Sequence, residues 1–196
     1  MKKLLLVILL LTSAVAKEAT YKSLLLDWKQ SSIEQKETMY RVYMYSSNDD
    51  LSFSASAIAW EETSNGKYEI QLSDNSGGTW DCGLFGNNTK TVLDNMGLKH
   101  SSYNKKMICT DLVKDEFLSY KFMIKQIDYG KKLHGKNWRK IWGTYNGGTI
   151  PNKGYGDRIA LRIQVIKYII GTHEAKTYIM ENMDIRHAVY HYNERI

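Results

Sequence analysis

The chain has 196 residues, of which 43% are hydrophobic, and this is enough for one domain with a real core. Its 27 Lys and Arg outnumber its 21 Asp and Glu, so the formal net charge is +6. The chain has one proline, no low-complexity segment and no internal repeat, which excludes a repeat architecture and leaves a single globular domain.

The first sixteen residues have the pattern of a secretory signal peptide. Two lysines at residues 2–3 precede an apolar run over about residues 4–11, and residues 14–16 read Ala-Val-Ala. Because the apolar run is too short for a comfortable membrane span, we expect cleavage after Ala16, with an uncleaved anchor as the alternative. The mature domain, residues 17–196, is then predicted to be periplasmic or secreted, with no stable membrane insertion.

The positive charge survives this processing. Two lysines and no acid are lost with residues 1–16, so the formal charge falls from +6 to +4. A basic exported protein favours an anionic extracellular polymer over nucleic acid as its partner, although a merely soluble basic surface explains the charge equally well.

Residues 18–46 are predicted to form two amphipathic helical segments, and a further helix follows at once. The Asn-Asp-Asp sequence at residues 48–50 can cap its first amides, and Gly66 can end it in a left-handed turn. Glu62 lies four residues after Ile58, so its carboxyl is expected at the end of the buried face. The apolar stripe of this helix consists of Leu51, Ala55, Ile58 and Ala59.

The middle of the chain contains the candidates for extended structure. An alternating tract that begins at Tyr68 is a short strand or an extended loop, and residues 74–78 form a turn-rich cluster. Asn88 and Thr89 can then cap a helix that ends at Gly97.

The second half of the chain is predicted to be helical throughout. Gly130 and Gly135 are expected to bracket one turn, and Gly147 and Gly148 to end a strongly aromatic helix. The fold class is therefore mainly α, or α+β at most, with one irregular or β-like region. The expected helices are residues 105–113, 118–131, 137–145 and 157–171, the last with a continuation to Met183.

The two cysteines, Cys82 and Cys109, leave two alternatives open. In an exported chain such a pair can oxidise, and the bridge would contribute about 3–4 kcal/mol in the loop-entropy model. Two free buried thiols are equally compatible with the sequence.

The Glu62 carboxyl is a candidate acid, because a carboxyl on a buried face costs free energy unless it is neutral or paired. Cleavage of a glycosidic bond needs such an acid, with its pKa raised by apolar surroundings. Glu61 is the alternative, since it follows Ala57 by four residues. Asp74 is a further candidate carboxylate, but an Asp in a turn is more often a capping residue.

Three short motifs, in the right order, resemble those of the soluble lytic transglycosylases of the lysozyme-like superfamily. Ala59-Trp60-Glu61-Glu62-Thr63 resembles the Glu-Ser signature of that family, with Thr63 at the place of its Ser. Residues 83–86, Gly-Leu-Phe-Gly, are similar to its Gly-Leu-Met-Gln segment, and residues 145–148, Tyr-Asn-Gly-Gly, to its Tyr-Asn-Ala-Gly segment. The resemblance covers about residues 48–171 and implies a lysozyme-like helical domain.

The resemblance implies that Glu62 is the catalytic acid. Gly86 replaces the Gln of the family, so that contact is absent or supplied by Asn87. The helical spacing of Trp138 and Trp142 favours core positions over a sugar platform. The residues implied or considered as substrate contacts are Thr63, Ser73, Trp80, Gly83, Leu84, Phe85, Asn87, Tyr145 and Asn146.

The implied partner is the glycan strand of peptidoglycan, and the implied reaction needs no cofactor. Glu62 would first protonate the leaving oxygen and then act as base while the muramic C6 hydroxyl attacks, which gives a 1,6-anhydro product. A hydrolytic muramidase, and an inactive wall-binding component of an envelope or secretion assembly, are the alternatives. His187 and His191 have the spacing of helical metal ligands but lack a clear third ligand, so no metal site is predicted.

Overall fold

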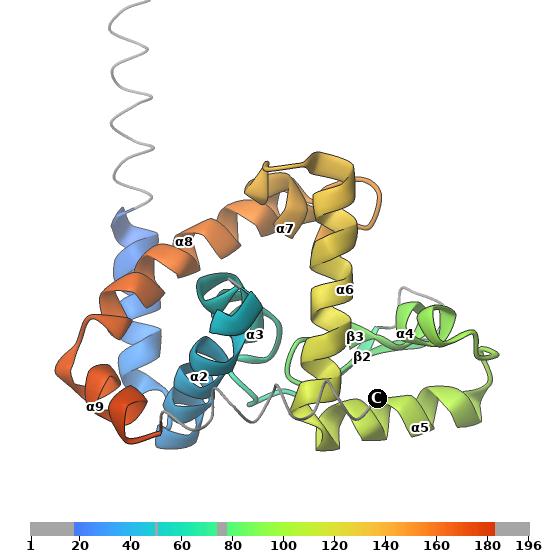
Figure 1. Ribbon diagram of the computed structural model, residues 1–196, viewed down its shortest axis with the longest axis horizontal. Helices are drawn as coiled ribbons and strands as arrows, with labels where there is room; N and C mark the ends of the chain where they lie inside the picture. Colours follow the sequence, from blue (N-terminus) through green and yellow to red (C-terminus); the bar gives the residue numbers. More distant parts are fainter. Residues whose placement is uncertain (1–17, 50, 74–77, 183–196) are drawn as a thin grey trace, which may run out of the picture.

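The computed structural model describes residues 18–49, 51–73 and 78–182, and it confirms a mainly helical fold with a small sheet (Figure 1). The predicted signal peptide lies outside the described residues. None of the helices within those residues has the length and apolar character needed to cross a membrane. After a helix of residues 18–30, the elements are α2 (Ile33–Tyr45), η1 (Ser46–Asp49), α3 (Ser52–Thr63), β1 (Ile70–Ser73), β2 (Thr79–Cys82), β3 (Asn87–Asn88), α4 (Thr89–Met96), α5 (Ser102–Lys114), α6 (Glu116–His134), α7 (Trp138–Gly147), α8 (Lys153–Ile170) and α9 (His173–Glu181).

Helix α3 is the centre of the fold and packs against both α2 and α8 (Figure 1). Four of its apolar residues, Ala55, Ala57, Ile58 and Ala59, have no exposed surface. A helix that is apolar on most sides must be buried, and the small Ala and Ser side chains of α3 let its neighbours approach. The indole Nε1 of Trp142 on α7 donates a hydrogen bond of 3.2 Å to the Ser54 hydroxyl, so α7 is also anchored to α3.

The sheet is antiparallel, with strand order β1-β2-β3. Ile70 pairs with Cys82, and Asp81 pairs with Asn88. Because side chains alternate along a strand, Asp81 lies on one face of β2 and Cys82 on the other. Cys82 forms a disulfide with Cys109 of α5, which settles the open alternative and joins the sheet to a second core cluster around α4 and α5.

The helix that carries Glu62 begins later than predicted. Residues 46–49 form a 3-10 turn, and the residue at the α3 N-cap is Leu51, which makes no side-chain capping bond. The end of the helix agrees better with the prediction, because Ser64, Asn65 and Gly66 all have positive φ.

Three further boundaries are corrected. Gly130 does not end a helix: it lies inside α6, where a Cβ would be 3.1 Å from the Ile141 carbonyl oxygen, so the glycine favours the close packing of α6 on α7. Helix α8 begins at Lys153, four residues before the predicted start, because the Asn152 side chain caps it. It also ends before Met183, since Thr172 caps the separate helix α9.

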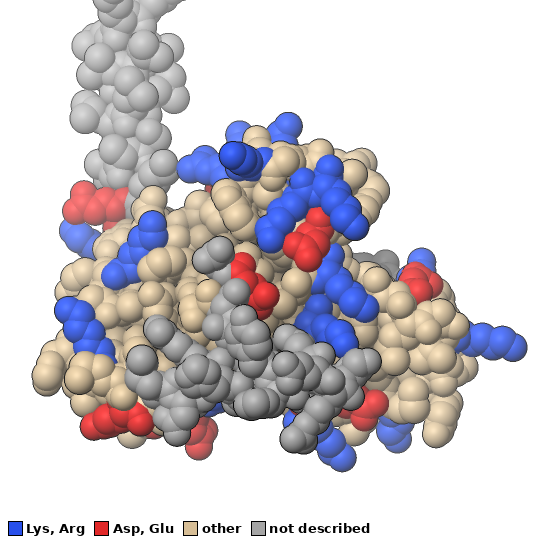
Figure 2. Space-filling model, in the orientation of Figure 1, with Lys and Arg blue, Asp and Glu red and all other residues tan. Residues whose placement is uncertain are grey.

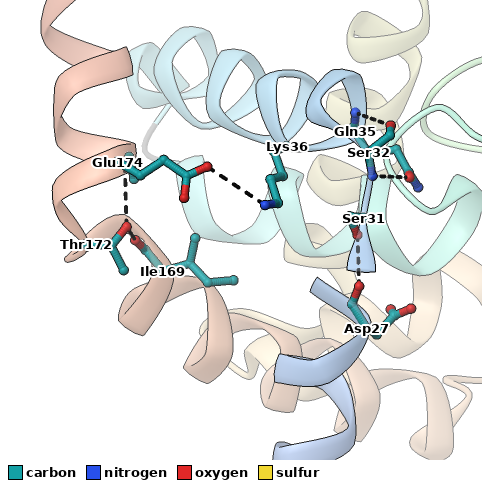
Figure 3. Close-up of polar contacts among 9 residues, drawn as sticks. Asp27, Ser31, Ser32, Gln35, Lys36, Ile169, Thr172 and Glu174 are labelled. Carbon is teal, nitrogen blue, oxygen red and sulfur yellow. Dashed lines mark hydrogen bonds and ion pairs between the residues drawn. The ribbon is translucent and has the colours of Figure 1, made fainter. Parts of the chain in front are cut away.

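The predicted break within residues 18–46 is present at the start of α2 (Figure 3). Ser32 and Gln35 form a reciprocal capping box, and the Ser31 hydroxyl donates to the Asp27 carbonyl oxygen. Lys36 reaches Glu174 of α9 at 3.9 Å, so the last described helix packs back against α2.

Candidate active site

Glu62 lies in a cavity of about 330 Å³ between the end of α3, the sheet, α4, α6 and α7. Three of the predicted substrate contacts, Asn87, Tyr145 and Asn146, lie in the same cavity. Its size and mixed polar and apolar walls are those of a small-ligand site. The lining residues are Glu62, Asp81, Gly86, Asn87, Asn88, Thr91, Val92, Phe122, Gln126, Thr144, Tyr145, Asn146 and Gly148.

The Glu62 carboxyl is half-buried and holds its proton at unusually high pH. Burial raises the pKa of Glu62 to about 7, and the nearby Tyr155 hydroxyl opposes the rise. The negative charges of Glu61 and Asp81 act in the same direction as burial. A carboxyl with this pKa exchanges its proton near neutral pH, as a general acid requires.

Glu61 has the opposite environment. Burial would raise the pKa of Glu61, but the charges and hydrogen bonds of Arg162 and Arg158 outweigh it and lower the pKa below the ordinary value. Arg162 Nε lies 2.7 Å from one Glu61 oxygen, and Arg158 Nε contacts the other. Glu61 is therefore an ionised partner of α8.

Because Gly86 has no side chain, there is room beside it for the Glu62 side chain. A Cβ at residue 86 would lie 2.8 Å from Glu62 Oε2, closer than real Cβ contacts, and a tight 3.0 Å from Glu62 Cβ. The backbone also has φ +58°, which favours glycine. Any side chain at this position would displace the carboxyl, so the residue that differs from the family motif is fitted to Glu62.

Two tyrosines stand beside this carboxyl. The Tyr145 hydroxyl donates a hydrogen bond of 2.6 Å to the Phe85 carbonyl oxygen, which ties α7 to the loop before Gly86. The Tyr145 and Tyr155 rings are stacked, with centroids 6.2 Å apart. The Tyr155 hydroxyl is buried and has no hydrogen-bond partner among the described residues. Its proton is therefore available to Glu62 or to a ligand.

Asn87 and Asn146 line the cavity with part of their bonding capacity already used. The Asn87 amide nitrogen donates to the carbonyl oxygen and the hydroxyl of Ser119. The Asn146 side-chain oxygen accepts a hydrogen bond of 2.9 Å from Asn152. Asn87 therefore does not offer its amide nitrogen in place of the missing Gln.

Four predicted substrate contacts lie beneath the cavity instead of lining it: Thr63, Gly83, Leu84 and Phe85. The buried Thr63 hydroxyl lies 3.0 Å from the Ala59 carbonyl oxygen and 2.9 Å from that of Leu84, and it accepts the Gly66 amide. Leu84 and Phe85 belong to the core. A Cβ at Gly83 would lie 2.5 Å from the Leu112 carbonyl oxygen, so this loop passes too close to α5 for a side chain.

Trp80 lies away from Glu62. Since it precedes Asp81 on β2, it points to the opposite face of the sheet. There it lines a separate hollow with Ile70, Lys106 and Cys109. Ser73 pairs with Thr79 in the backbone ladder, and its side chain is outside the described part, as is Asp74.

The sequence did not reveal that Asp81 enters the cavity. Its carboxyl accepts a hydrogen bond of 2.8 Å from Asn88, while burial raises its pKa. The opposing strand places Gln71 next to Asp81, and the Gln71 amide donates to the Glu62 carbonyl oxygen. Strand alternation alone could have placed Asp81 and Trp80 on opposite faces, but the face toward Glu62 depends on the disulfide and on the strand register.

Trp142 is buried, as its spacing predicts, but the predicted core position of Trp138 is wrong, because this residue on the same helix is 37% exposed. Within the described residues, no group of three or more His, Cys, Asp or Glu side chains could hold a metal ion. His187 and His191 lie outside those residues.

Comparisons of the chain with models of protein families, with curated proteins and with solved structures found no match.

Proposed function

We propose that the protein is a peptidoglycan lytic transglycosylase, which cleaves the β-1,4 bond between N-acetylmuramic acid and N-acetylglucosamine. The observation that carries this proposal is the position of Glu62. Its carboxyl lines a cavity of ligand size and has a pKa of about 7, while its neighbour Glu61 is held ionised by two arginines. The resemblance of the sequence motifs to those of the soluble lytic transglycosylases is the basis for proposing peptidoglycan as the substrate.

One carboxyl supplies both proton transfers in this mechanism. Glu62 donates its proton to the glycosidic oxygen as the bond to C1 breaks, and the N-acetylglucosamine side leaves as an alcohol. The muramic C6 hydroxyl then attacks C1 and gives its proton to the Glu62 carboxylate, which restores the acid and forms the 1,6-anhydro ring. The Tyr155 hydroxyl can donate a hydrogen bond to the Glu62 carboxylate between these steps, because it has no hydrogen-bond partner among the described residues.

Asp81 supports a second candidate, a hydrolytic muramidase. It is a second carboxylate in the cavity, carried by β2, and it would activate or orient a water in place of the C6 hydroxyl. The replacement of the family's Gln by Gly86 would favour the inactive wall-binding alternative if it removed a contact that catalysis needs. The fit of Gly86 to Glu62 favours an active enzyme, because the glycine makes room for the acid.

A periplasmic or extracellular location belongs to the same proposal. The Cys82–Cys109 disulfide is compatible with an oxidising compartment outside the cytoplasm. Peptidoglycan would be accessible to the protein there.

Digestion of purified sacculi, followed by mass spectrometry of the released fragments, tests these alternatives. Anhydro-ended muropeptides, absent with Glu62→Gln, are the expected result. Reducing-ended fragments that disappear with Asp81→Asn would replace the transglycosylase by the muramidase. No release after long incubation would reject both enzymes and favour a wall-binding protein.

A further inference from the structure

The positive charge of the protein is concentrated in one stretch. Residues 125–158 contain eight Lys and Arg but only two Asp, a net charge of +6. The rest of the chain contains nineteen basic and nineteen acidic residues, so its formal charge is zero. This stretch comprises the second half of α6, all of α7 and the first residues of α8.

These segments meet at one end of the molecule, where Lys and Arg side chains gather (Figures 1 and 2). A hollow of about 400 Å³ there brings together residues of three helices, including His134, Lys140 and Lys153. Both acids of the stretch are already paired: Asp128 with Lys131 at 3.1 Å, and Asp157 with Arg139 at 3.0 Å.

Four lysines of this end are left with uncompensated charge. Lys132, Lys136, Lys140 and Lys153 are exposed, and none of them forms an ion pair with another residue in the described ranges. Such a surface attracts an extended anionic partner and does so less at high salt.

Large apolar side chains are exposed among these lysines. Leu133 in the last turn of α6 is 47% exposed, Trp138 in the first turn of α7 is 37% exposed, and Ile150 before α8 is 81% exposed. Nucleic acids and anionic polysaccharides attract the lysines and can stack on Trp138, but they have little apolar surface that could cover exposed Leu and Ile side chains. A bilayer interacts favourably with the lysines, the Trp and the aliphatic side chains alike. Its headgroups attract lysine, its interface takes up Trp, and its acyl chains take up the aliphatic side chains.

We propose that this end of the protein, formed by Lys132, Leu133, Lys136, Trp138, Lys140 and Ile150, docks on the surface of an anionic lipid bilayer. The docking is peripheral: the lysines contact the lipid headgroups, and Ile150 and Leu133 enter the interface. The inference is independent of the chemistry at Glu62, because none of the six residues lines that cavity.

Co-sedimentation of the full chain with lipid vesicles tests this proposal. The wild-type protein is compared on phosphatidylcholine vesicles with and without phosphatidylglycerol, at low and at high salt. Lys136→Glu/Lys140→Glu removes charge from the proposed surface. Lys90→Glu/Lys99→Glu is the matched control, because it changes the net charge equally but away from this end, on α4 and the loop after it (Figure 1). Residues 1–16 are the same in every variant, so their contribution cancels in the comparison.

The wild type and the control are expected to bind phosphatidylglycerol vesicles with similar partition coefficients. Lys136→Glu/Lys140→Glu is expected to lose at least about tenfold, since each basic residue near an anionic surface contributes measurably. Ile150→Ser, at a position too exposed to affect folding, is expected to weaken binding at low and high salt alike.

Equal binding by the two charge variants would overturn the proposal. So would unchanged vesicle binding by Ile150→Ser together with tighter, Lys136-dependent binding to a single-stranded oligonucleotide or an anionic polysaccharide, which would assign the surface to a polymer. Cleavage of soluble glycan fragments, measured in parallel, separates this result from a failure of the proposed enzyme activity.

Discussion

Two adjacent carboxyls at the end of α3 face two different regions of the molecule. Glu61 points to α8, where Arg158 and Arg162 bind both of its oxygens, and its pKa is lowered. Glu62 points to the loop that contains Gly86, where burial without a comparable cation raises its pKa to about 7. Both are surrounded by protein, so burial alone does not explain the difference. The positive charges supplied by α8 decide which carboxyl is ionised, and the other is left able to hold a proton.

Loss of the proposed proton donor is expected to have the largest effect. Glu62→Gln keeps the shape of the side chain but cannot transfer a proton, so cleavage of sacculi should fall by about 10²–10⁴-fold. Glu61→Gln should retain most of the activity, because that residue pairs with α8. If the two variants lose activity equally, the distinction between the two carboxyls is wrong.

The wild type and Glu62→Gln should differ in how their free energy of unfolding depends on pH. Because the folded-state pKa of Glu62 lies above its ordinary value of 4.5, its contribution to stability is fully present below about pH 4.5 and is lost as pH rises through about 7. Glu62→Gln should therefore match the wild type near pH 4 and be more stable at pH 8, by about 3 kcal/mol. Denaturant unfolding at the two pH values measures this. A difference that does not change with pH would contradict the assigned pKa.

Filling the space beside Glu62 should impair activity more than stability. Gly86→Ala and Gly97→Ala both place alanine at positive φ, +58° and +67°, and each should cost about 1 kcal/mol of stability. Only the first puts a methyl group against the carboxyl, because nothing lies within 4 Å of a Cβ at residue 97. Cleavage by Gly86→Ala should fall by about 10–100-fold relative to Gly97→Ala. Equal rates for the two alanine variants would show that Gly86 does not position Glu62.

The smallest expected effect is a change in the pH profile of Glu61→Gln. Removing this negative charge, and releasing Arg158 from its partner, both favour the ionised form of Glu62. The alkaline limb of the cleavage profile should therefore move to lower pH. An alkaline limb that does not move would mean that the charge of Glu61 does not reach the cavity. The variant should also be less stable by about 1–3 kcal/mol, because Arg162 is left partly buried without its carboxylate.

Much of the local structure was predictable because its causes are local. Asn88 and Gly97 begin and end α4 as expected, since capping depends on neighbouring backbone groups. The buried stripe of α3 and the position of Glu62 on it followed from helical spacing. Gly130 was misjudged because a glycine inside a helix and a glycine after a helix look alike until the packing partner, Ile141, is known.

The sequence by itself determined the mainly helical character of the chain, the cap residues of α4, and two glutamates at the end of a buried face. The tertiary structure decided which of those two glutamates is ionised and which keeps its proton near neutral pH. The arginines that hold Glu61 come from 97 and 101 residues further along the chain. The face of β2 that carries Asp81 is turned toward Glu62 by strand register and by the Cys82–Cys109 disulfide. The space at Gly86 exists only where that loop crosses the end of α3. Burial and charge depend on neighbours in space, so no periodicity along the chain could show which carboxyl keeps its proton.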